Sequence, residues 1–474
     1  MAMVNLTASN AGAPSGRQLH LNAFLMTTGH HEASWRLAES DPWAATDIEH
    51  YKKMARVAEK ATFDSLFLAD SPSIWGNVGR RPLGVLEPLT LLTALAGATD
   101  HIGLVATAST SYNSPYNLAR KFASLDHVSG GRAGWNIVTT ASPEAARNFG
   151  LDVQSSHAER YQRATEFIDV VRKLWDSWED DAIVADKASG VWGDETKIHP
   201  PAHHGRHFSV YGALDIPRSP QGYPLLVQAG SSEDGNRLAA RYADAVFTAQ
   251  QTLADAQAFY ADLKGRTARL GRDPRTIKIL PGIVPVIGGT EREALEKEAT
   301  LEELLVHSYA QRELAQLLRV PVEHLHLDQQ LPDDIPGEDE IEGAKSRYTL
   351  IVGLGRRDHL TVRQLIARLG GGRGHRTVAG TPEQVAETIE EWFVSGAADG
   401  FNVMPAALPS GLADFADHVV PLLRSRGLYR REYEGTTLRH RYGLARPENQ
   451  YLAAARRPSP DLRGPVPVLE GSLI

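Results

Sequence analysis

Short apolar runs alternate with longer segments of helical periodicity along most of this 474-residue chain. The runs lie at 19–25, 65–70, 102–107, 134–140, 224–230, 245–248, 277–287 and 400–404. Helical patterns lie between them, at 46–61, 88–100, 115–128, 157–178, from 234 onward, and at 291–318 and 381–397. Such an alternation is typical of βα units and a parallel sheet whose strands are buried on both faces. The sequence therefore predicts an α/β fold.

Eight predicted strands, all but the last followed by a helix, are most economically a closed (β/α)8 TIM barrel. A doubly wound open sheet is the alternative, because counting strands does not show whether the sheet closes. Two ranges, 179–222 and 319–360, break the rhythm and are predicted as insertions in one barrel domain spanning 19–446. Residues 1–18 are predicted as a disordered leader, and 447–474 as a C-terminal tail.

Composition excludes several classes of function. Cysteine is absent, which excludes disulfides, thiolate metal sites, iron–sulfur clusters and cysteine nucleophiles. The formal net charge of −8 gives no electrostatic footprint for nucleic acid or an anionic membrane. No window approaches the ~18 uninterrupted apolar residues of a membrane helix, and the N-terminus lacks the apolar core of a signal peptide. We therefore expect a cytoplasmic protein that binds neither nucleic acid nor membrane.

Several catalytic and binding motifs are missing from the sequence. No G-x-G-x-x-G follows a predicted strand, and neither a P-loop nor a G-x-S-x-G elbow is present, so nicotinamide binding, ATP chemistry and serine hydrolysis have no support. Four histidines crowd into one short stretch, at His199, His203, His204 and His207. The adjacent Pro200 and Pro201 prevent a regular helical face that would gather ligands, so we predict no metal site.

Function in a barrel gathers at the carboxyl ends of the strands. Those ends present Asp70, Thr107 and Asn136, together with the turn Gly230-Ser231-Ser232. Hydroxyl and amide groups outnumber acid–base groups there, so the site is predicted to bind a polar organic molecule. Asp70 has two interpretations: a polar anchor beside a bound ring, or a simple turn former.

Two helix starts are candidate anion sites. The turn with Ser231 and Ser232 precedes a helix whose start fits an N-cap pattern of Ser231 with Asp234, and a helix N-terminus favours a phosphate. An ordinary capped turn is the alternative. His157 and Tyr161 are four residues apart and share one face of the next candidate helix. They either hold a phosphate jointly or pack against a neighbouring strand.

His30 and His31 follow the first predicted strand, on the side of the barrel where substrates bind. They are therefore better candidates for contacting a substrate than the four crowded histidines. The segment after Leu428 shows no obvious element and is a candidate for wrapping a partner subunit.

Ordered motifs between residues 19 and 446 resemble one protein family. They include Leu21-Asn22-Ala23-Phe24 with Gly29-His30-His31, Trp135-Asn136-Ile137-Val138-Thr139, His157-Ala158-Glu159-Arg160-Tyr161, Gln228-Ala229-Gly230-Ser231-Ser232 and Asp399-Gly400-Phe401-Asn402. This chain resembles the nitrilotriacetate monooxygenase component A family of bacterial-luciferase-like, FMN-dependent monooxygenases.

The resemblance implies a luciferase-like TIM barrel that uses reduced FMN (FMNH2) and O2 to oxygenate a small organic substrate, with oxidation or cleavage of a C–N or C–S bond. It implies a separate NAD(P)H:flavin reductase as partner, and we expect a homodimer or homotetramer. In relatives, the positions matching Asp70, Thr107, His157, Tyr161 and Ser231 or Ser232 contact the flavin. Asn136 is added by its place at a strand end, and His31 or His30 is the candidate catalytic residue.

Two alternatives remain on the same barrel. One is a deazaflavin (F420)-dependent oxidoreductase that transfers hydride without consuming O2. The other is a non-catalytic barrel that binds flavin without substrate-dependent oxygen uptake. In the FMN-dependent monooxygenase, the two insertions are expected to close over the site as lids.

Overall fold

The computed structural model describes residues 16–74, 78–79, 82, 86–337, 340–341, 345–372 and 374–456. Most of the predicted leader, and residues 457–474 of the predicted tail, lie outside these ranges.

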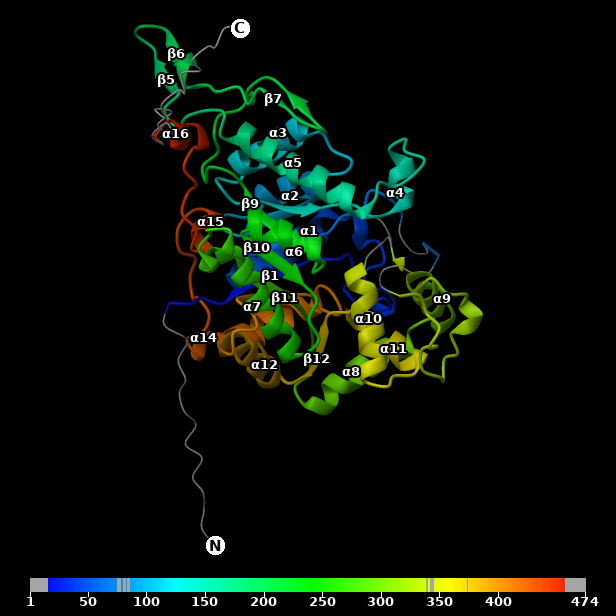
Figure 1. The fold of residues 1–474 in the computed structure, drawn as a ribbon. Coiled ribbons are helices and arrows are strands. Elements are labelled where there is room, and N and C mark those ends of the chain that lie inside the picture. Colours follow the sequence, from blue (N-terminus) through cyan, green and yellow to red (C-terminus); the bar gives the residue numbers. More distant parts are fainter. Residues whose placement is uncertain are drawn as a thin grey trace, which may run out of the picture.

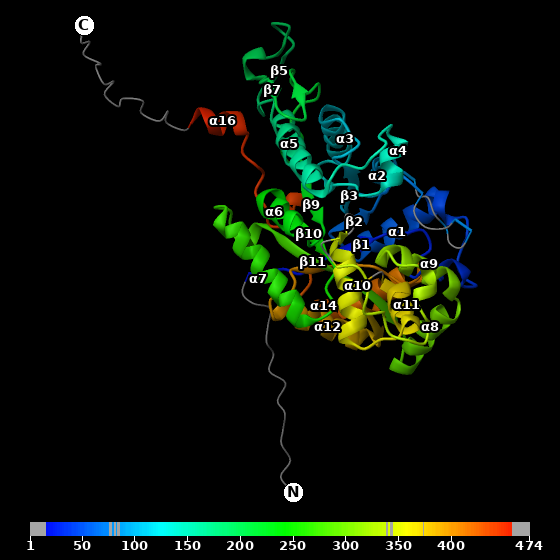
Figure 2. The ribbon, with the colours of Figure 1, turned by 45° about the vertical axis from the view of Figure 1, so that its right-hand side comes forward.

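Eight parallel strands close into a barrel at the centre of the molecule (Figures 1 and 2). In chain order they are β1 (His20–Phe24), β2 (Ser65–Leu68), β3 (Gly103–Ser109), β4 (Ala133–Val138), β9 (Leu225–Ala229), β10 (Ala245–Thr248), β11 (Lys278–Ile287) and β13 (Gly400–Val403). The ring closes because β10 pairs with β11 and β13 pairs with both β11 and β1. The predicted barrel is thereby confirmed, and the open sheet is excluded.

The predicted helices surround this barrel, with ends within a few residues of those expected. They are α1 (Ile48–Lys60), α2 (Pro88–Ala96), α3 (Pro115–Val128), α5 (His157–Trp175), α6 (Glu233–Tyr242) and α12 (Pro382–Val394). Local chemistry fixes their starts: Asp47 and Ser156 accept first-turn N–H groups, and Thr381 forms a capping box with Gln384. One further helix, α7 (Leu253–Arg269), follows β10, where no helical range was predicted.

The middle of the barrel is filled by aromatic rings from three strands. Phe24 of β1 lies edge-on to Phe67 of β2, with ring centroids 4.9 Å apart, and Phe247 of β10 lies 5.6 Å from Phe24. All three side chains are buried. The middle of the barrel is therefore a packed aromatic core.

The N-terminal end of the barrel is closed by the chain's own C-terminal segment, which includes α15 (Leu438–Arg441). The Tyr442 hydroxyl donates to Asn22 Oδ1 at 2.9 Å, inside β1. Arg439 pairs with Asp244 at 2.7 Å, and a Cβ on Gly103 would collide with Leu438. The segment after Leu428 was a candidate for wrapping a partner subunit; within this chain it packs against its own barrel.

The first predicted insertion contains two antiparallel hairpins. They are β5 (Ile183–Asp186) with β6 (Val191–Gly193), and β7 (His203–His204) with β8 (Ser209–Val210). The residues of β5 and the first two of β6 are exposed, and this hairpin lies at one end of the molecule (Figure 1). The first insertion also contacts α16 (Gln450–Ala455), where Tyr451 stacks on His199.

The second predicted insertion, 319–360, contains one α-helix among its described residues, α10 (Lys345–Arg357), which its irregular pattern did not predict. Together with α8 (Glu291–Glu303) and α9 (His307–Leu318) before it and α11 (Val362–Gly372) after it, α10 forms a helical unit that we call the helical insertion; the added strand β12 (Arg376–Gly380) follows. The predicted single helix over 291–318 is wrong, because it breaks between α8 and α9. Both ribbon views place these four helices on one side of the barrel, and α9, α10 and α11 share their own apolar core (Figures 1 and 2).

Shorter elements complete the described chain. They are η1 (Ser34–Arg36), η2 (Ala44–Thr46), α4 (Pro143–Asn148), η3 (Glu195–Lys197), η4 (Pro274–Thr276), η5 (Val322–His324), α13 (Ser410–Asp414), the π-helical η7 (Phe415–Val419) and α14 (Val420–Ser425).

Candidate active site

Thr107 and Asn136 lie side by side on the inner face of the barrel near its C-terminal end. They are register partners in β3 and β4, and the Asn136 side-chain amide donates to Thr107 Oγ1 at 2.7 Å. Strand alternation places Thr107 on the same face as Val105, which packs inside the barrel. Among the described residues, the buried Asn136 Oδ1 has no hydrogen-bond donor. This oxygen is an acceptor available to a bound molecule, because buried polar atoms are otherwise almost always paired.

Asp70 lies two residues past the end of β2 and is half-buried. Burial and the nearby charge of Glu87 raise the pKa of its carboxyl group, and the Ser71 N–H opposes that rise. The structure gives Asp70 no hydrogen bond to Thr107 or Asn136 among the described contacts. It therefore stands at the same rim of the barrel as these two residues without joining their pair.

The starts of α5 and α6 meet, and four predicted or capping residues come together there. The His157 ring and the Tyr161 ring lie 4.8 Å apart on one face of α5. His157 Nδ1 lies 3.0 Å from Asp234 Oδ2, and the Tyr161 hydroxyl lies 3.5 Å from Ser232 Oγ. Side chains from two helices thus surround the N-terminus of α6, whose first N–H groups and dipole favour an anion.

The N-cap of α6 is Ser232, which corrects the expected pairing of Ser231 with Asp234. Ser232 Oγ accepts the Gly235 N–H at 3.2 Å, and Ser231 precedes it in the turn after β9. Gly230 has a φ of +120°, a conformation that few residues with a side chain adopt. The glycine therefore lets the chain turn sharply from the strand end into the helix.

Gln228, at the end of β9, was not among the predicted site residues. Its side-chain amide donates to the Ala229 carbonyl at 2.7 Å, while its buried Oε1 has no partner among the described residues. A Cβ on Gly235 would lie 3.3 Å from both Gln228 Nε2 and the Tyr161 hydroxyl, so these groups converge on the start of α6. The sequence did carry a signal for Gln228, because its polar amide lies near the end of an otherwise apolar predicted strand.

His30 is held within the loop that follows β1. Its Nε2 lies 2.9 Å from the Phe24 carbonyl oxygen, and its ring packs edge-on against the Phe24 ring at 4.5 Å. The same loop pairs with the loop after β13, through His30 N–H to Pro405 O at 3.0 Å. Gly29 makes this approach possible, because a Cβ there would lie 2.2 Å from Ala406 O.

His31 faces a different space, a cavity of about 350 Å³ beneath α8 and α11. Its Nδ1 accepts the Ala33 N–H at 3.1 Å, so the neutral ring carries its proton on Nε2. That Nε2 is buried and has no acceptor among the described residues. Burial lowers the pKa of His31 to about 4, so the ring is a neutral hydrogen-bond donor near pH 7.

The cavity beside His31 is polar and carries both signs of charge. Glu298, Glu302, Arg368 and Gln364 line it together with the end of β11 and the start of β12. Burial raises the pKa of Glu298 and of Glu302, and the charge of Glu302 raises that of Glu298 further. The backbone N–H of Glu32 donates to the Gly370 carbonyl at 3.0 Å, which joins the loop after β1 to α11.

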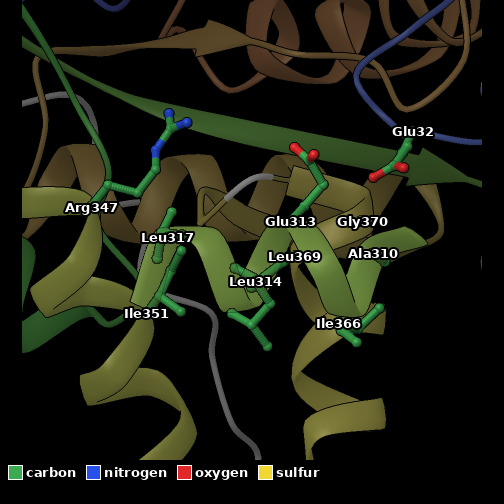
Figure 3. A pocket seen from close by; sticks show the side chains of 10 residues that line it. All are labelled: Glu32, Ala310, Glu313, Leu314, Leu317, Arg347, Ile351, Ile366, Leu369 and Gly370. Carbon is green, nitrogen blue, oxygen red and sulfur yellow. The ribbon is translucent and has the colours of Figure 1, made fainter. Parts of the chain in front are cut away.

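A second pocket of about 180 Å³ lies within the helical insertion, between α9, α10 and α11. Figure 3 shows apolar side chains along its length, with Arg347 toward one end and Glu313 and Glu32 toward the other. Because Glu32 and Gly370 also border the His31 region, this pocket adjoins the 350 Å³ cavity through α11 and the loop after β1.

His375 is a further residue that the sequence did not single out as a site residue. Its ring stacks on Phe247 at 4.9 Å with an angle of 6° between the planes, above the aromatic centre of the barrel. A Cβ on Gly282 would lie 2.3 Å from His375 Nδ1, so the glycine in β11 makes room for the ring. Its neighbouring run of glycines gave no sign that the ring would sit on the barrel axis.

The crowded histidines of the first insertion have separate partners. His199 lies 2.8 Å from Glu179, His203 lies 3.0 Å from Glu166, and His204 lies 2.9 Å from Ser209. Over the described ranges, no group of three or more metal-ligating side chains is gathered.

Comparison with known proteins identifies the family. The model of the luciferase-like monooxygenases matches residues 23–399. This chain belongs to the luciferase-like monooxygenase family. It is 47% identical to nitrilotriacetate monooxygenase component A of Aminobacter aminovorans, over 92% of this chain and 98% of that protein. It is 46% identical to N-acetyl-S-(2-succino)cysteine monooxygenase of Bacillus subtilis (strain 168), again over 92% and 98% of the two chains.

Solved structures that are similar to this chain support the same family assignment. Riboflavin lyase, in a structure with modified FMN and riboflavin, superposes with a TM-score of 0.79 at 31% identity, covering 90% of this chain and 96% of that one. An F420-dependent secondary alcohol dehydrogenase superposes with a TM-score of 0.54 at 14% identity, which shows a shared fold alone. The predicted family and the predicted class, a flavin-dependent monooxygenase, are confirmed. Within the described part of this family member, no helix is long and apolar enough to cross a membrane.

Proposed function

We propose that this monooxygenase binds reduced FMN at the C-terminal end of its barrel and uses O2 to oxygenate a small organic substrate at a C–N or C–S bond. The observation that carries the proposal is the convergence of His157, Tyr161 and Ser232 on the N-terminus of α6. A helix start with hydroxyl and imidazole groups around it suits the phosphate of FMN.

The remaining residues fit the rest of the cofactor. The ribityl chain of FMN carries hydroxyls, and Thr107, Ser231 and Asp70 offer polar groups at neighbouring strand ends. The ring system carries donors as well as acceptors, and the unpaired Asn136 Oδ1 is a buried acceptor suited to a ring N–H. Reduced FMN, when bound, supplies the electrons that activate O2, while the protein supplies binding, orientation and exclusion of water.

We assign the role at the reacting centre to His31 in preference to His30. His30 Nε2 is engaged by the Phe24 carbonyl, whereas His31 Nε2 holds a proton toward a cavity. With a pKa of about 4, His31 donates a hydrogen bond as a neutral ring near pH 7 and does not act as a charged acid. It would orient a substrate oxygen or nitrogen acceptor in the 350 Å³ cavity, with Arg368 and Gln364 as further contacts.

The helical insertion supports a role in covering the site. The bond from the Glu32 N–H to the Gly370 carbonyl holds α11 against the loop that carries His31. We propose that α8–α11 exclude water from the substrate cavity, as lids do in enzymes with reactive intermediates. The proposed role of the first insertion as a lid rests on the sequence alone.

A separate NAD(P)H:flavin reductase is the proposed partner. The relative from Aminobacter aminovorans is named component A, which points to a second component. No G-x-G-x-x-G follows a strand of this barrel, so the chain offers no Rossmann site for a nicotinamide of its own.

Oxygen uptake tests the proposal directly. The protein is mixed with FMN, NADH and a generic flavin reductase, and oxygen uptake is measured with aminopolycarboxylates, sulfones, sulfides and antibiotic precursors. The proposal expects uptake above the reductase background with at least one class, accompanied by an oxygenated product. Flavin binding without uptake or product in any class favours the non-catalytic barrel, and hydride exchange with F420 without O2 consumption favours the deazaflavin enzyme.

Anaerobic titration tests the site assignment. Replacing Tyr161 by Phe together with Ser231 by Ala removes two hydroxyls near the start of α6, and we expect the Kd for reduced FMN to rise about tenfold, since each lost hydrogen bond costs about 0.5–1.5 kcal/mol. The exposed Ser124→Ala variant on α3 is the matched hydroxyl control. An unchanged Kd in the folded double variant rejects this phosphate site.

A further inference from the structure

A cavity of about 400 Å³ lies at the N-terminal end of the barrel, opposite the proposed FMN site. We call it the basal cavity; its walls include Arg17, Lys264, Lys278, Asp399 and Arg441. These residues come from the chain before β1, from α7, from the start of β11, from the residue before β13 and from α15. The cavity therefore joins both ends of the described chain to the base of the barrel.

One carboxylate in the basal cavity is fully used by its neighbours. Asp399 accepts from Lys264 Nζ at 2.9 Å, from Arg17 Nη2 at 3.2 Å and from the Tyr260 hydroxyl at 2.9 Å. The Ile279 N–H adds a fourth bond at 3.0 Å. Asp399 thus balances one positive charge, and its two oxygens have little hydrogen-bonding capacity left for another cation.

Lys278 and Arg441 have no carboxylate partner. Among the described residues, no acidic oxygen lies within 4.0 Å of either cation, and Lys278 Nζ donates to the Arg275 carbonyl at 2.8 Å. Arg441 is 4% exposed; its Nη1 donates to the His101 carbonyl, while its buried Nε and Nη2 have no acceptor within the described chain. Burial lowers the pKa of both side chains, as expected for cations short of counter-charge.

The surroundings do not supply the missing negative charge. His20 borders the cavity, and burial lowers its pKa, but the adjacent Asp64 is already paired with Arg430 at 2.7 Å. Arg275 is largely exposed and pairs with Asp273. The 15 residues that precede Gly16 contain no Asp or Glu. Four cations therefore face one carboxylate, in a chain whose formal net charge is −8.

We propose that the basal cavity binds a small oxyanion of the phosphate class carrying two negative charges. Arg441 offers two guanidinium nitrogens, Nε and Nη2, that have no acceptor among the described residues and suit the tetrahedral oxygens of phosphate, and Lys278 on the same cavity supplies a compact charge. Arg441 is a buried cation without a carboxylate partner among the described residues, which is costly, and a dianion beside it offsets that cost. The bound anion would join β11 to α15 and hold the C-terminal segment in the base of the barrel.

Calorimetric titration of the whole chain with phosphate tests this proposal. Saturating FMN is present throughout, so that the phosphate site at α6 is filled, and sodium chloride keeps the ionic strength constant. We expect one molar equivalent of inorganic phosphate to bind and to raise the Tm in a concentration-dependent way. Sulfate and glycerol phosphate, titrated separately, distinguish a site for any tetrahedral dianion from a site for phosphate monoesters.

Two variants localise the binding. Lys278→Met and Arg441→Gln should each weaken phosphate binding at least tenfold, whereas Arg292→Met on α8, which removes an exposed and already paired cation away from the cavity, should leave the Kd unchanged. If Arg441→Gln does not fold, Lys278→Met at the start of β11 carries the test alone. Absence of binding to the FMN-saturated protein, or equal binding by Lys278→Met and the native chain, overturns the proposal.

Discussion

Replacing Arg430 by Met should destabilise the protein strongly, because it leaves the buried Asp64 carboxylate without its cationic partner. Asp64 has no exposed surface and lies 2.7 Å from Arg430 Nη2, with the Leu21 N–H at 2.8 Å and His20 Nδ1 at 3.0 Å. After the substitution only the last two contacts remain. Removing one partner of a buried ion pair costs about 3–5 kcal/mol, because the other charge stays buried without compensation.

Thermal unfolding measures this loss. An unfolding entropy of about 2.1 cal/mol/K per residue gives about 1 kcal/mol/K for 474 residues, so the Tm should fall by about 3–5 °C. Arg431→Met removes an exposed cation from the adjacent position and is the matched control, with an expected change under about 0.5 °C. The double variant Asp64→Asn with Arg430→Met removes both charges and should recover part of the lost stability.

The pH dependence of the same variant provides the decisive comparison. The positive charge of Arg430 is the main factor that lowers the pKa of Asp64 to about 2, against the opposing effect of burial. A carboxyl whose folded pKa is depressed stabilises the fold above its ordinary pKa and loses that contribution as the pH falls toward 2. The gap in Tm between the native chain and Arg430→Met should therefore be larger at pH 7 than at pH 3. A gap that is absent at pH 7, or equal at the two pH values, refutes the reasoning.

Three further substitutions test the site. Gly29→Ala places a Cβ 2.2 Å from Ala406 O at a φ of +137°, so activity and Tm should both fall, whereas Gly97→Ala at the end of α2 should change neither in a thermal and kinetic assay. Asp70→Asn removes a carboxyl group whose pKa is raised by burial. The Tm at pH 7 should therefore hold or rise slightly, while calorimetry should show weaker binding of reduced FMN. His31→Ala should lower kcat at least tenfold with the Kd for FMN unchanged, and NMR of the native chain should show the His31 ring neutral down to about pH 4; an inflection near pH 6.5 contradicts this.

The barrel could be predicted from the sequence because its signals are local. Each strand is a run of apolar residues buried on both faces, and each helix start carries its own cap, such as Ser156 or Thr381. Parallel strands also fix which residues share an edge, so Thr107 and Asn136 were expected at one end before their hydrogen bond was seen. Such features depend on neighbours in sequence or on the general geometry of parallel sheets.

Helix α10, within 319–360, was not predicted, for the opposite reason. Gly353 and Gly355 within α10 lower its intrinsic helix propensity, by roughly 1 kcal/mol each relative to Ala. The helix forms because Tyr348, Ile351 and Leu354 pack into a core shared with α9 and α11. Tertiary packing outweighs local propensity here, and nothing in the local pattern of 319–360 reports that packing.

The two ends of the barrel likewise differ in how far the sequence predicts the positions of their functional residues. At the C-terminal end, the groups that converge are attached to strand ends and helix starts, and their positions follow from the fold; His375 is the exception, since it reaches Phe247 from an irregular segment. At the N-terminal end, Arg430, Arg439 and Arg441 arrive from a segment whose sequence carries no pattern, and each is fixed by a partner more than 190 positions away.

A basic, unpatterned tail is therefore ambiguous in sequence between a contact with another subunit and a contact with its own barrel. The ambiguity is resolved by buried acids: Asp64 and Asp244 lie beside strand starts, where a carboxylate is tolerated only with a cation supplied from elsewhere. Unpaired acids at the starts of buried strands thus predict that a distant basic segment returns to close the barrel.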